Sequence, residues 1–273
     1  MRINKFLSEC GICSRREADR LVQAGHVSVN GQPALMGMDV SDADEVRVDG
    51  RVVHRQETKT YLRFYKPKGI VCTFEASEPH NLRKCLENLD VRVTYAGRLD
   101  RNSEGLMILT DDGDLIDRMM RARNGHEKEY EVTADRPVTE AFLMKMQKGV
   151  YLEELGVTTR PCRAWQTGER SFHIVLTQGL NRQIRRMCAV CGYKVRELKR
   201  VRIVNVLLGD MKPGEIEPLT DAERQELLRR TGEEGHRTAG IQQHTEQHWD
   251  GKPVRSQNAG IHVTRSHIAS EPR

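Results

Sequence analysis

Residues 97–110 read Gly-Arg-Leu-Asp-Arg-Asn-Ser-Glu-Gly-Leu-Met-Ile-Leu-Thr and place a single carboxylate, Asp100, ahead of an apolar run. The apolar residues 106–109 are typical of a buried strand. Positive charge on Arg98 and Arg101 favours the ionised form of the carboxylate between them. We therefore predict a loop that presents a charged Asp100 beside a rigid strand. There it can act as a nucleophile or stabilise a cationic sugar, and the alternative is a surface aspartate paired with its neighbours.

The length and composition predict a globular protein with a large core and a small accessory domain. The chain has 273 residues, of which 37% are hydrophobic and 30% charged. No run approaches the roughly 18 apolar residues that span a bilayer, and no apolar signal segment follows the N-terminus. We expect a cytoplasmic protein without membrane association. Nothing in the sequence predicts an oligomer, so we expect a monomer.

Residues 1–50 predict a small α/β module. Ser14 with Glu17 three residues later is a capping-box pattern that opens a helix. Residues 27–29 alternate as a strand and lead into an Asn30-Gly31 turn, and a second short strand follows at residues 40–48. Few large apolar side chains are available here, which suits an accessory domain.

The predicted helix of this module is basic. Arg15, Arg16 and Arg20 share one helical sector about a turn apart, where they suit contacts with RNA phosphates. The polar residues 51–59 predict a linker to the next domain.

Residues 60–230 predict the main domain. Strands are expected at residues 61–65, 70–73, 106–110, 128–133, 172–176 and 195–206, and helices at residues 114–120, 139–148, 180–191 and 221–228. In the last strand we expect Leu198, Val201 and Ile203 to face the core. Strands outnumber helices without a repeating βαβ order, so we predict an α+β fold with a mixed, largely antiparallel sheet.

Residues 231–273 predict a disordered polar tail. They contain few large apolar side chains, and five of the ten histidines of the chain. Such a segment cannot bury enough surface to offset its ordering entropy. Contact with RNA is the favoured role, and metal binding by the histidines is the alternative.

A basic cluster occupies residues 181–202. Eight basic residues against one acid, Glu197, give this stretch a local charge of +7, whereas the whole chain carries only +5. The basic residues are Arg182, Arg185, Arg186, Lys194, Arg196, Lys199, Arg200 and Arg202. Phosphate contacts are the functional interpretation, and a solvated helix face with an exposed strand edge is the alternative.

Two of the cysteine pairs have CxxC spacing. Cys10 and Cys13 lie almost the whole chain away from Cys188 and Cys191, and each pair falls in a helical stretch. A four-thiolate zinc site would join the pairs, but the same spacing places two small hydrophobic side chains on one helix face. We expect reduced structural thiols and no metal.

Four ordered motifs resemble those of the ribosomal pseudouridine synthases. They are Lys66-Pro67-x-Gly69; Gly97-Arg98-Leu99-Asp100 with residues 109–113; Lys128-x-Tyr130; and Gly179-x-Asn181 through Met187. Residues 2–48 resemble the S4-type RNA-binding module of the small-subunit-type branch. Residues 126–130 and 179–187 are most similar to its large-subunit members lettered F. The resemblance spans about residues 1–228.

This resemblance implies an S4-like module followed by a pseudouridine synthase domain. It implies isomerisation of a uridine in ribosomal RNA, above all large-subunit RNA, with tRNA as an open second substrate. The reaction breaks the base–sugar bond, rotates the base and rejoins it through carbon. Because no redox step or group donor is involved, we expect no cofactor.

The family pattern also implies roles for individual residues. Asp100 is the essential carboxylate, acting on the sugar or on the base, and Arg185 pairs with it. Tyr130 stacks on the uracil and assists proton transfer, while Ile184 forms a wall of the site. Arg98 helps to hold the opened RNA.

Further residues are expected to bind substrate. Arg182 belongs to the basic run that contacts phosphates, as do Arg15, Arg16 and Arg20 of the N-terminal module. Lys128 is a further candidate, and Lys66 is expected to be structural or to contact phosphate.

Two other functions compete with this interpretation. A non-catalytic RNA-binding or ribosome-assembly protein could use the same scaffold. An Asp-dependent glycosyl-transfer enzyme is the second, but glycosidases use a second carboxylate as general acid, and the sequence offers no convincing partner for Asp100.

Overall fold

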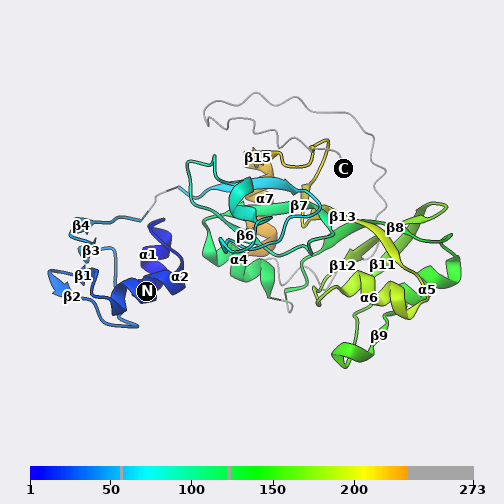
Figure 1. The fold of residues 1–273 in the computed structure, drawn as a ribbon, viewed down its shortest axis with the longest axis horizontal. Coiled ribbons are helices and arrows are strands. Elements are labelled where there is room, and N and C mark those ends of the chain that lie inside the picture. Colours follow the sequence, from blue (N-terminus) through cyan, green and yellow to red (C-terminus); the bar gives the residue numbers. More distant parts are fainter. Residues whose placement is uncertain (56–57, 122–123, 233–273) are drawn as a thin grey trace. The chain divides into compact units, whose positions relative to one another are not determined.

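The computed structural model describes residues 1–55, 58–121 and 124–232, which form two units (Figure 1). The first unit comprises Met1–Tyr61, Asp90–Thr94 and Thr110–Asp114, and the second comprises Leu62–Leu89, Tyr95–Leu109 and the residues from Leu115 on. Apart from Thr231 and Gly232, the predicted tail lies outside the described residues. None of the described helices is long and apolar enough to cross a membrane.

The first unit packs two helices with a small antiparallel sheet. Its elements are α1 (Ile3–Glu9), α2 (Arg15–Gln23), β1 (Val27–Val29), β2 (Gln32–Pro33), β3 (Val46–Val48) and β4 (Arg51–Val52), with strand order β2-β1-β3-β4. The predicted start of α2 is confirmed, since the Ser14 hydroxyl accepts a hydrogen bond from the Glu17 backbone N–H at 3.2 Å. The predicted turn is also confirmed, because Asn30 and Gly31 have φ values of 51° and 80°.

Two predictions for this unit are wrong in detail. Arg51 and Val52 form β4 instead of opening the linker, because Asp49 and Gly50 repeat the left-handed turn geometry, with φ values of 50° and 78°, and fold the chain back onto β3. Val40 lies outside the strands, although it is buried in the core of the unit.

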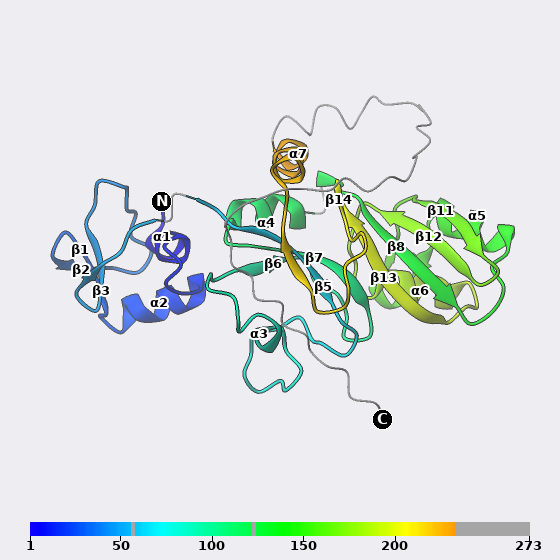
Figure 2. The same cartoon turned by 90° about the horizontal axis from the view of Figure 1, so that it is seen from above.

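The second unit is built on one mixed sheet. Its strands are β5 (Tyr61–Lys66), β6 (Thr94–Ala96), β7 (Glu104–Thr110), β8 (Lys128–Ala134), β11 (Arg163–Gly168), β12 (Ser171–Leu176), β13 (Val195–Ile203), β14 (Val206–Leu207) and β15 (Ile216–Pro218). The main path has the strand order β11-β12-β8-β13-β7-β5-β15, and Figure 2 shows β11, β12, β8 and β13 side by side. The pairs β11/β12, β12/β8, β8/β13 and β15/β5 are antiparallel, whereas β7 and β13 run parallel. The predicted α+β class with a largely antiparallel, mixed sheet is confirmed.

The other elements of this unit connect or cover the sheet. They are α3 (Leu82–Cys85), α4 (Gly113–Met120), α5 (Glu140–Lys148), α6 (Gln183–Val190), α7 (Asp221–Thr231), the short strands β9 (Tyr151–Leu152) and β10 (Val157–Thr158), and a 3-10 turn at Glu153–Leu155. The predicted capping box of α7 is present, with reciprocal hydrogen bonds between Thr220 and Glu223.

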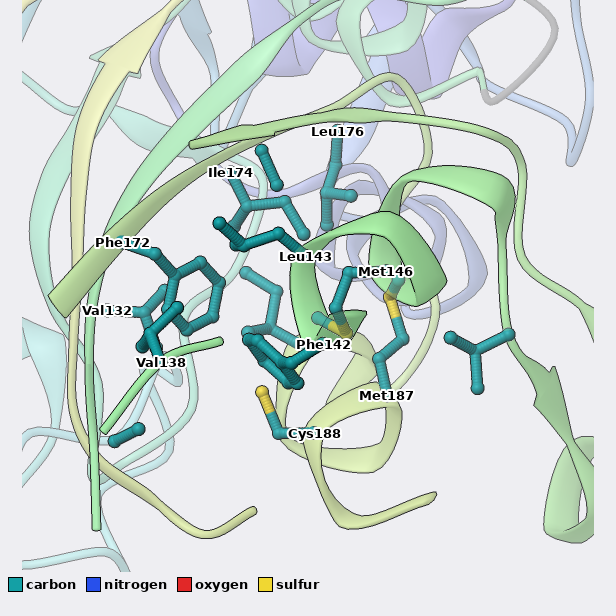
Figure 3. Packing of buried hydrophobic residues seen from close by; sticks show 14 of the residues in the cluster. Val132, Val138, Phe142, Leu143, Met146, Phe172, Ile174, Leu176, Met187 and Cys188 are labelled. Carbon is teal, nitrogen blue, oxygen red and sulfur yellow. The ribbon is translucent and has the colours of Figure 1, made fainter. Parts of the chain in front are cut away.

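Helices α5 and α6 pack on one face of the sheet and close a hydrophobic core (Figure 3). Phe142 of α5 meets Phe172 of β12 edge to face, with ring centroids 5.3 Å apart. Met187 of α6 is fully buried in the same cluster as Val132 of β8. The sheet face that carries these contacts continues into the cleft described below.

Two further predictions are wrong for physical reasons. Residues 70–73 do not form a strand, because Gly69 turns the chain with φ 86° and donates its N–H to the Arg101 carbonyl at 2.8 Å. Helix α6 begins at Gln183 instead of Leu180, because Arg182 adopts a left-handed backbone with φ 51°.

An irregularity in β13 sends neighbouring basic residues to opposite faces. Arg200 lies opposite Tyr130 of β8, but Arg202 lies opposite Glu129, so the register shifts between them. Such a bulge re-aims a side chain. The predicted core position Val201 is therefore only half-buried, whereas Arg200 is 1% exposed.

Strands β7 and β13 approach closely at Gly105. A Cβ atom at this position would lie 2.3 Å from the Arg200 carbonyl oxygen, and the backbone has φ +110°. Only glycine fits this contact without moving backbone.

We therefore predict that Gly105→Ala destabilises the protein by more than about 2 kcal/mol, because clash and backbone strain add. Gly156→Ala is the matched control, since Gly156 has φ +63° but nothing within 4 Å of its Cβ position. The control should cost about 1 kcal/mol. Urea unfolding of both variants measures the difference, and equal costs would contradict the close-approach argument.

Candidate active site

A cleft of about 510 Å³ lies in the second unit. It is lined by residues from the β6–β7 loop, β8, the segment after β12, α6 and β13, including Arg98, Asp100, Lys128, Tyr130, Arg182, Ile184, Leu198 and Arg200. Leu198 and Ile184 also belong to the hydrophobic core, so the cleft has a packed wall. The structure thus brings six of the sequence-predicted site residues together from distant parts of the chain.

Asp100 is half-buried, with 31% of its side chain exposed, and its closest charged partner is Arg182. The distance from Asp100 Oδ2 to Arg182 Nη1 is 3.8 Å. Arg182 immediately precedes α6, and its backbone has a left-handed conformation. Backbone strain of this kind persists where the surroundings enforce it, and it clusters at functional sites.

The predicted direct pairing of Arg185 with Asp100 is wrong in this structure. The Arg185 guanidinium is occupied by the Val195 carbonyl at 3.2 Å and the Asn102 carbonyl at 2.9 Å, with the Ser103 hydroxyl at 3.2 Å. Burial, followed by the charge of Arg182, lowers the pKa of Arg185, and the charge of Asp100 opposes that shift.

Lys66 holds the same loop from the other side. Its side chain is fully buried, and its Nζ donates to the Ser103 carbonyl and the Pro67 carbonyl, each at 2.7 Å. Burial lowers the pKa of Lys66 to about 8. The loop that carries Asp100 is therefore fixed by two cations that bind its backbone carbonyls.

Tyr130 and Lys128 point to the cleft from β8. They lie two residues apart on one strand, so their side chains share a face. Lys128 is half-buried and makes one hydrogen bond, to the His126 carbonyl at 3.3 Å. Burial, followed by the charge of Arg200, lowers the pKa of Lys128 to about 8.

Arg200 is a site residue that the sequence analysis placed in the exposed basic cluster. It is almost fully buried, lines the cleft, and donates from Nε to the Leu106 carbonyl at 2.7 Å. A signal for its burial was present. Leu198 is a core position, and Arg200 lies two residues later on the same strand, so the two side chains share a face.

Several residues of the basic cluster form ion pairs with glutamates of this chain. Lys199 pairs with Glu131 at 3.0 Å, and Arg202 pairs with Glu127 and Glu129 at 3.0 and 2.9 Å. Arg186 pairs with Glu154. The prediction of phosphate contacts in this stretch now depends on its exposed residues Arg182, Lys194 and Arg196.

The remaining predicted residues lie elsewhere or play other parts. Arg15, Arg16 and Arg20 are exposed on α2 of the first unit. All seven cysteines are free thiols. Cys10 and Cys13 belong to the core of the first unit, and Cys188 to that of the second.

Comparisons with known proteins agree on the family. A model described as RNA pseudouridylate synthase matches residues 60–190, and an S4 domain model matches residues 1–46. The dual-specificity RNA pseudouridine synthase RluF of Escherichia coli is 45% identical over 231 residues, which cover 84% of this chain and 79% of the relative. The chain belongs to the RNA pseudouridylate synthase family.

Other relatives support the same assignment. An uncharacterized RNA pseudouridine synthase of Aquifex aeolicus is 36% identical, over 84% of this chain and 97% of its own length. A crystal structure of a pseudouridylate synthase superposes with a TM-score of 0.61 at 28% identity, covering 83% of this chain and 99% of that one. The chain is thus an RNA pseudouridine synthase with an N-terminal S4 domain, and the predicted similarity to members lettered F is confirmed. The individual residue roles stay predictions.

The low pKa of Lys128 gives a stability prediction. Between its folded pKa of about 8 and its ordinary value of 10.5, the unfolded chain binds more protons, so the contribution of Lys128 to stability rises with pH. At pH 7 Lys128 is charged, so the full desolvation cost of its buried ammonium group lowers the free energy of unfolding. We expect Lys128→Met to raise the free energy of unfolding at pH 7 by up to about 3 kcal/mol, and this gain should shrink as the pH rises toward 10.

Urea unfolding at several pH values between 7 and 10 measures this difference. Lys148→Met is the matched control, because Lys148 is exposed in the last turn of α5. A gain for Lys128→Met that does not change with pH would contradict the burial penalty.

Proposed function

We propose that this pseudouridine synthase modifies a specific uridine in large-subunit ribosomal RNA, with Asp100 as the essential carboxylate. One relative, from Vibrio cholerae, is named ribosomal large subunit pseudouridine synthase B and is 35% identical over 78% of this chain. The RluF relatives are named dual-specificity enzymes, which favours a second RNA substrate, and tRNA is our candidate. The S4 domain match supports an RNA partner.

The observation that carries the proposal is the isolation of Asp100 in the cleft. Among the described residues that line the cleft, Asp100 is the only carboxylate, and cations surround it. A glycosidase-type mechanism uses a second carboxylate as general acid, so this arrangement favours isomerisation over hydrolysis. Rejoining the base to the same sugar needs no acid to release a leaving group into solvent.

The geometry supports a role for each neighbouring residue. The uridine must leave its stack to reach the cleft, at a cost of a few kcal/mol. Tyr130 offers an aromatic surface for the flipped base, and Ile184 also lines the cleft. Arg182 lies 3.8 Å from Asp100, and Arg98 is exposed and lines the cleft, where it would hold the opened strand.

The S4 domain would contribute backbone contacts. Arg15, Arg16 and Arg20 are all exposed on α2, where phosphates can reach them, although Arg20 also pairs with Glu17 at 2.9 Å. An enzyme of ribosomal RNA acts where that RNA is made, so the proposal includes a cytoplasmic location, with the chain acting as a monomer.

We predict that Asp100→Asn lowers the rate of pseudouridine formation by about 10³-fold or more, because the carboxylate charge is lost while the shape is kept. The measurement is a pseudouridine map of total RNA, by carbodiimide-primer extension, from cells without the protein, with wild type and with Asp100→Asn. One site in large-subunit RNA should be lost with the protein and restored by wild type only.

The control is Asp117→Asn, since Asp117 lies on α4 outside the cleft lining and pairs with Arg121 at 2.7 Å. It should restore the site fully. Full restoration by Asp100→Asn would contradict the catalytic assignment and favour the non-catalytic RNA-binding alternative. A site that is lost from small-subunit RNA or tRNA alone would contradict the proposed target.

A further inference from the structure

Two cations in the cleft lack an anionic partner. Within the described ranges, no carboxylate lies within 4.0 Å of the Arg200 guanidinium or of Lys128 Nζ. Arg200 is only 1% exposed, and its buried Nη2 atom has no hydrogen-bond partner among the described residues. A buried, unsatisfied charged donor is destabilising. Lys66 differs, because two carbonyls accept hydrogen bonds from its buried Nζ.

The two cations lie on the same face of the sheet as Tyr130. Arg200 is directly opposite Tyr130 in the β8/β13 register, and Lys128 lies two residues from Tyr130 on β8. All three line the cleft that also contains Asp100. Arg200 shares this face with Leu198, two residues before it, and the bulge after Arg200 turns Arg202 to the other face, where it pairs with Glu129.

A ligand that pairs with Lys128 and Arg200 must carry negative charge at the place where the flipped base would lie, beside Tyr130. We propose that Lys128 and Arg200 form an anion site for the uracil ring itself, which becomes negatively charged when it separates from the sugar. The inference deepens the proposed function and rests on it. The two residues would bind the carbonyl oxygens of the ring and hold the detached base while it rotates.

The reaction balances with this role. The bond between C1′ and N1 breaks, and its electron pair stays on the ring, where N1 shares the charge with the two carbonyl oxygens. The base then rotates, C5 forms the new bond to C1′, and the proton that C5 loses is matched by the proton that N1 gains. Fixed positive charges aimed at developing negative charge lower such a barrier without reorganising.

The depth of the site favours the base over an RNA phosphate. Phosphates stay at the surface of a folded RNA, and the exposed cations Arg98 and Arg182 line the cleft where a backbone can reach them. Arg200 is buried beside Tyr130, where the flipped ring is expected to stack. The same burial excludes water, which strengthens the attraction for a charged ring.

The test compares two leaving groups. A stem-loop RNA with the target uridine, and the same RNA with 5-fluorouridine at that position, are each reacted in single turnover with saturating wild type, Lys128→Met and Arg200→Met. Cleavage of the bond between C1′ and N1 is followed in both, because C5 of the fluorinated ring has no proton to lose. Fluorine withdraws electrons and makes the ring anion more stable by itself. We expect both variants to slow cleavage of the uridine RNA by about 10²-fold, to slow cleavage of the fluorinated RNA about tenfold less, and to leave Kd within about twofold.

The controls separate this effect from folding and from phosphate binding. Lys128→Arg keeps the charge and should retain most activity, while Lys148→Met, an exposed charge outside the cleft, should behave as wild type. If Arg200→Met fails to fold, Lys128→Met alone decides. Equal slowing of both substrates overturns the anion site, as does a loss confined to Kd and its salt dependence. If the wild type forms no pseudouridine in the uridine RNA, the proposed function fails as well.

Discussion

The site depends on hydrogen bonds from buried cations to the backbone of the loop that carries Asp100. Lys66 binds the carbonyl of Ser103, and Arg185 binds the carbonyl of Asn102, at 2.7 and 2.9 Å. Bonds from charged donors are about twice as strong as neutral ones, and the bond from Lys66 is buried, whereas Arg185 is half-buried. Because both donors bind backbone, they fix the position of Asp100 without neutralising its carboxylate. The cation nearest to this carboxylate is Arg182, whose Nη1 atom lies 3.8 Å from Asp100 Oδ2.

The strand beside this loop imposes the second constraint. Gly105 lets β7 meet β13 so closely that no side chain fits between them, and the Arg200 side chain then binds the Leu106 carbonyl. The bulge that follows gives β13 a cleft face and an outer face with different chemistry. The outer face carries ion pairs of Arg202 and Lys199 with glutamates of β8, whereas Arg200 on the cleft face pairs with no carboxylate of the part of the chain that the structure describes.

Local signals predicted most of the fold, while tertiary effects explain the misses. Caps, turns and alternation at Ser14, Asn30-Gly31 and residues 106–109 depend on near neighbours, so the sequence shows them directly. The motifs named Asp100, Tyr130 and Ile184, which the structure brings to one cleft. The charged partner of Asp100 was missed because a left-handed residue, Arg182, precedes α6. The outward turn of Arg202 was missed because a bulge follows Arg200.

Hydrogen exchange in Lys66→Met tests most directly whether buried Lys66 positions the loop that carries Asp100. The Ser103 N–H binds the Asp100 carbonyl and the Gly69 N–H binds the Arg101 carbonyl, so both amides report on the loop. The account predicts that these amides exchange about tenfold faster or more in the variant, while β13 is unchanged and pseudouridine formation slows at saturating RNA. Unchanged exchange at both amides together with full activity would contradict it.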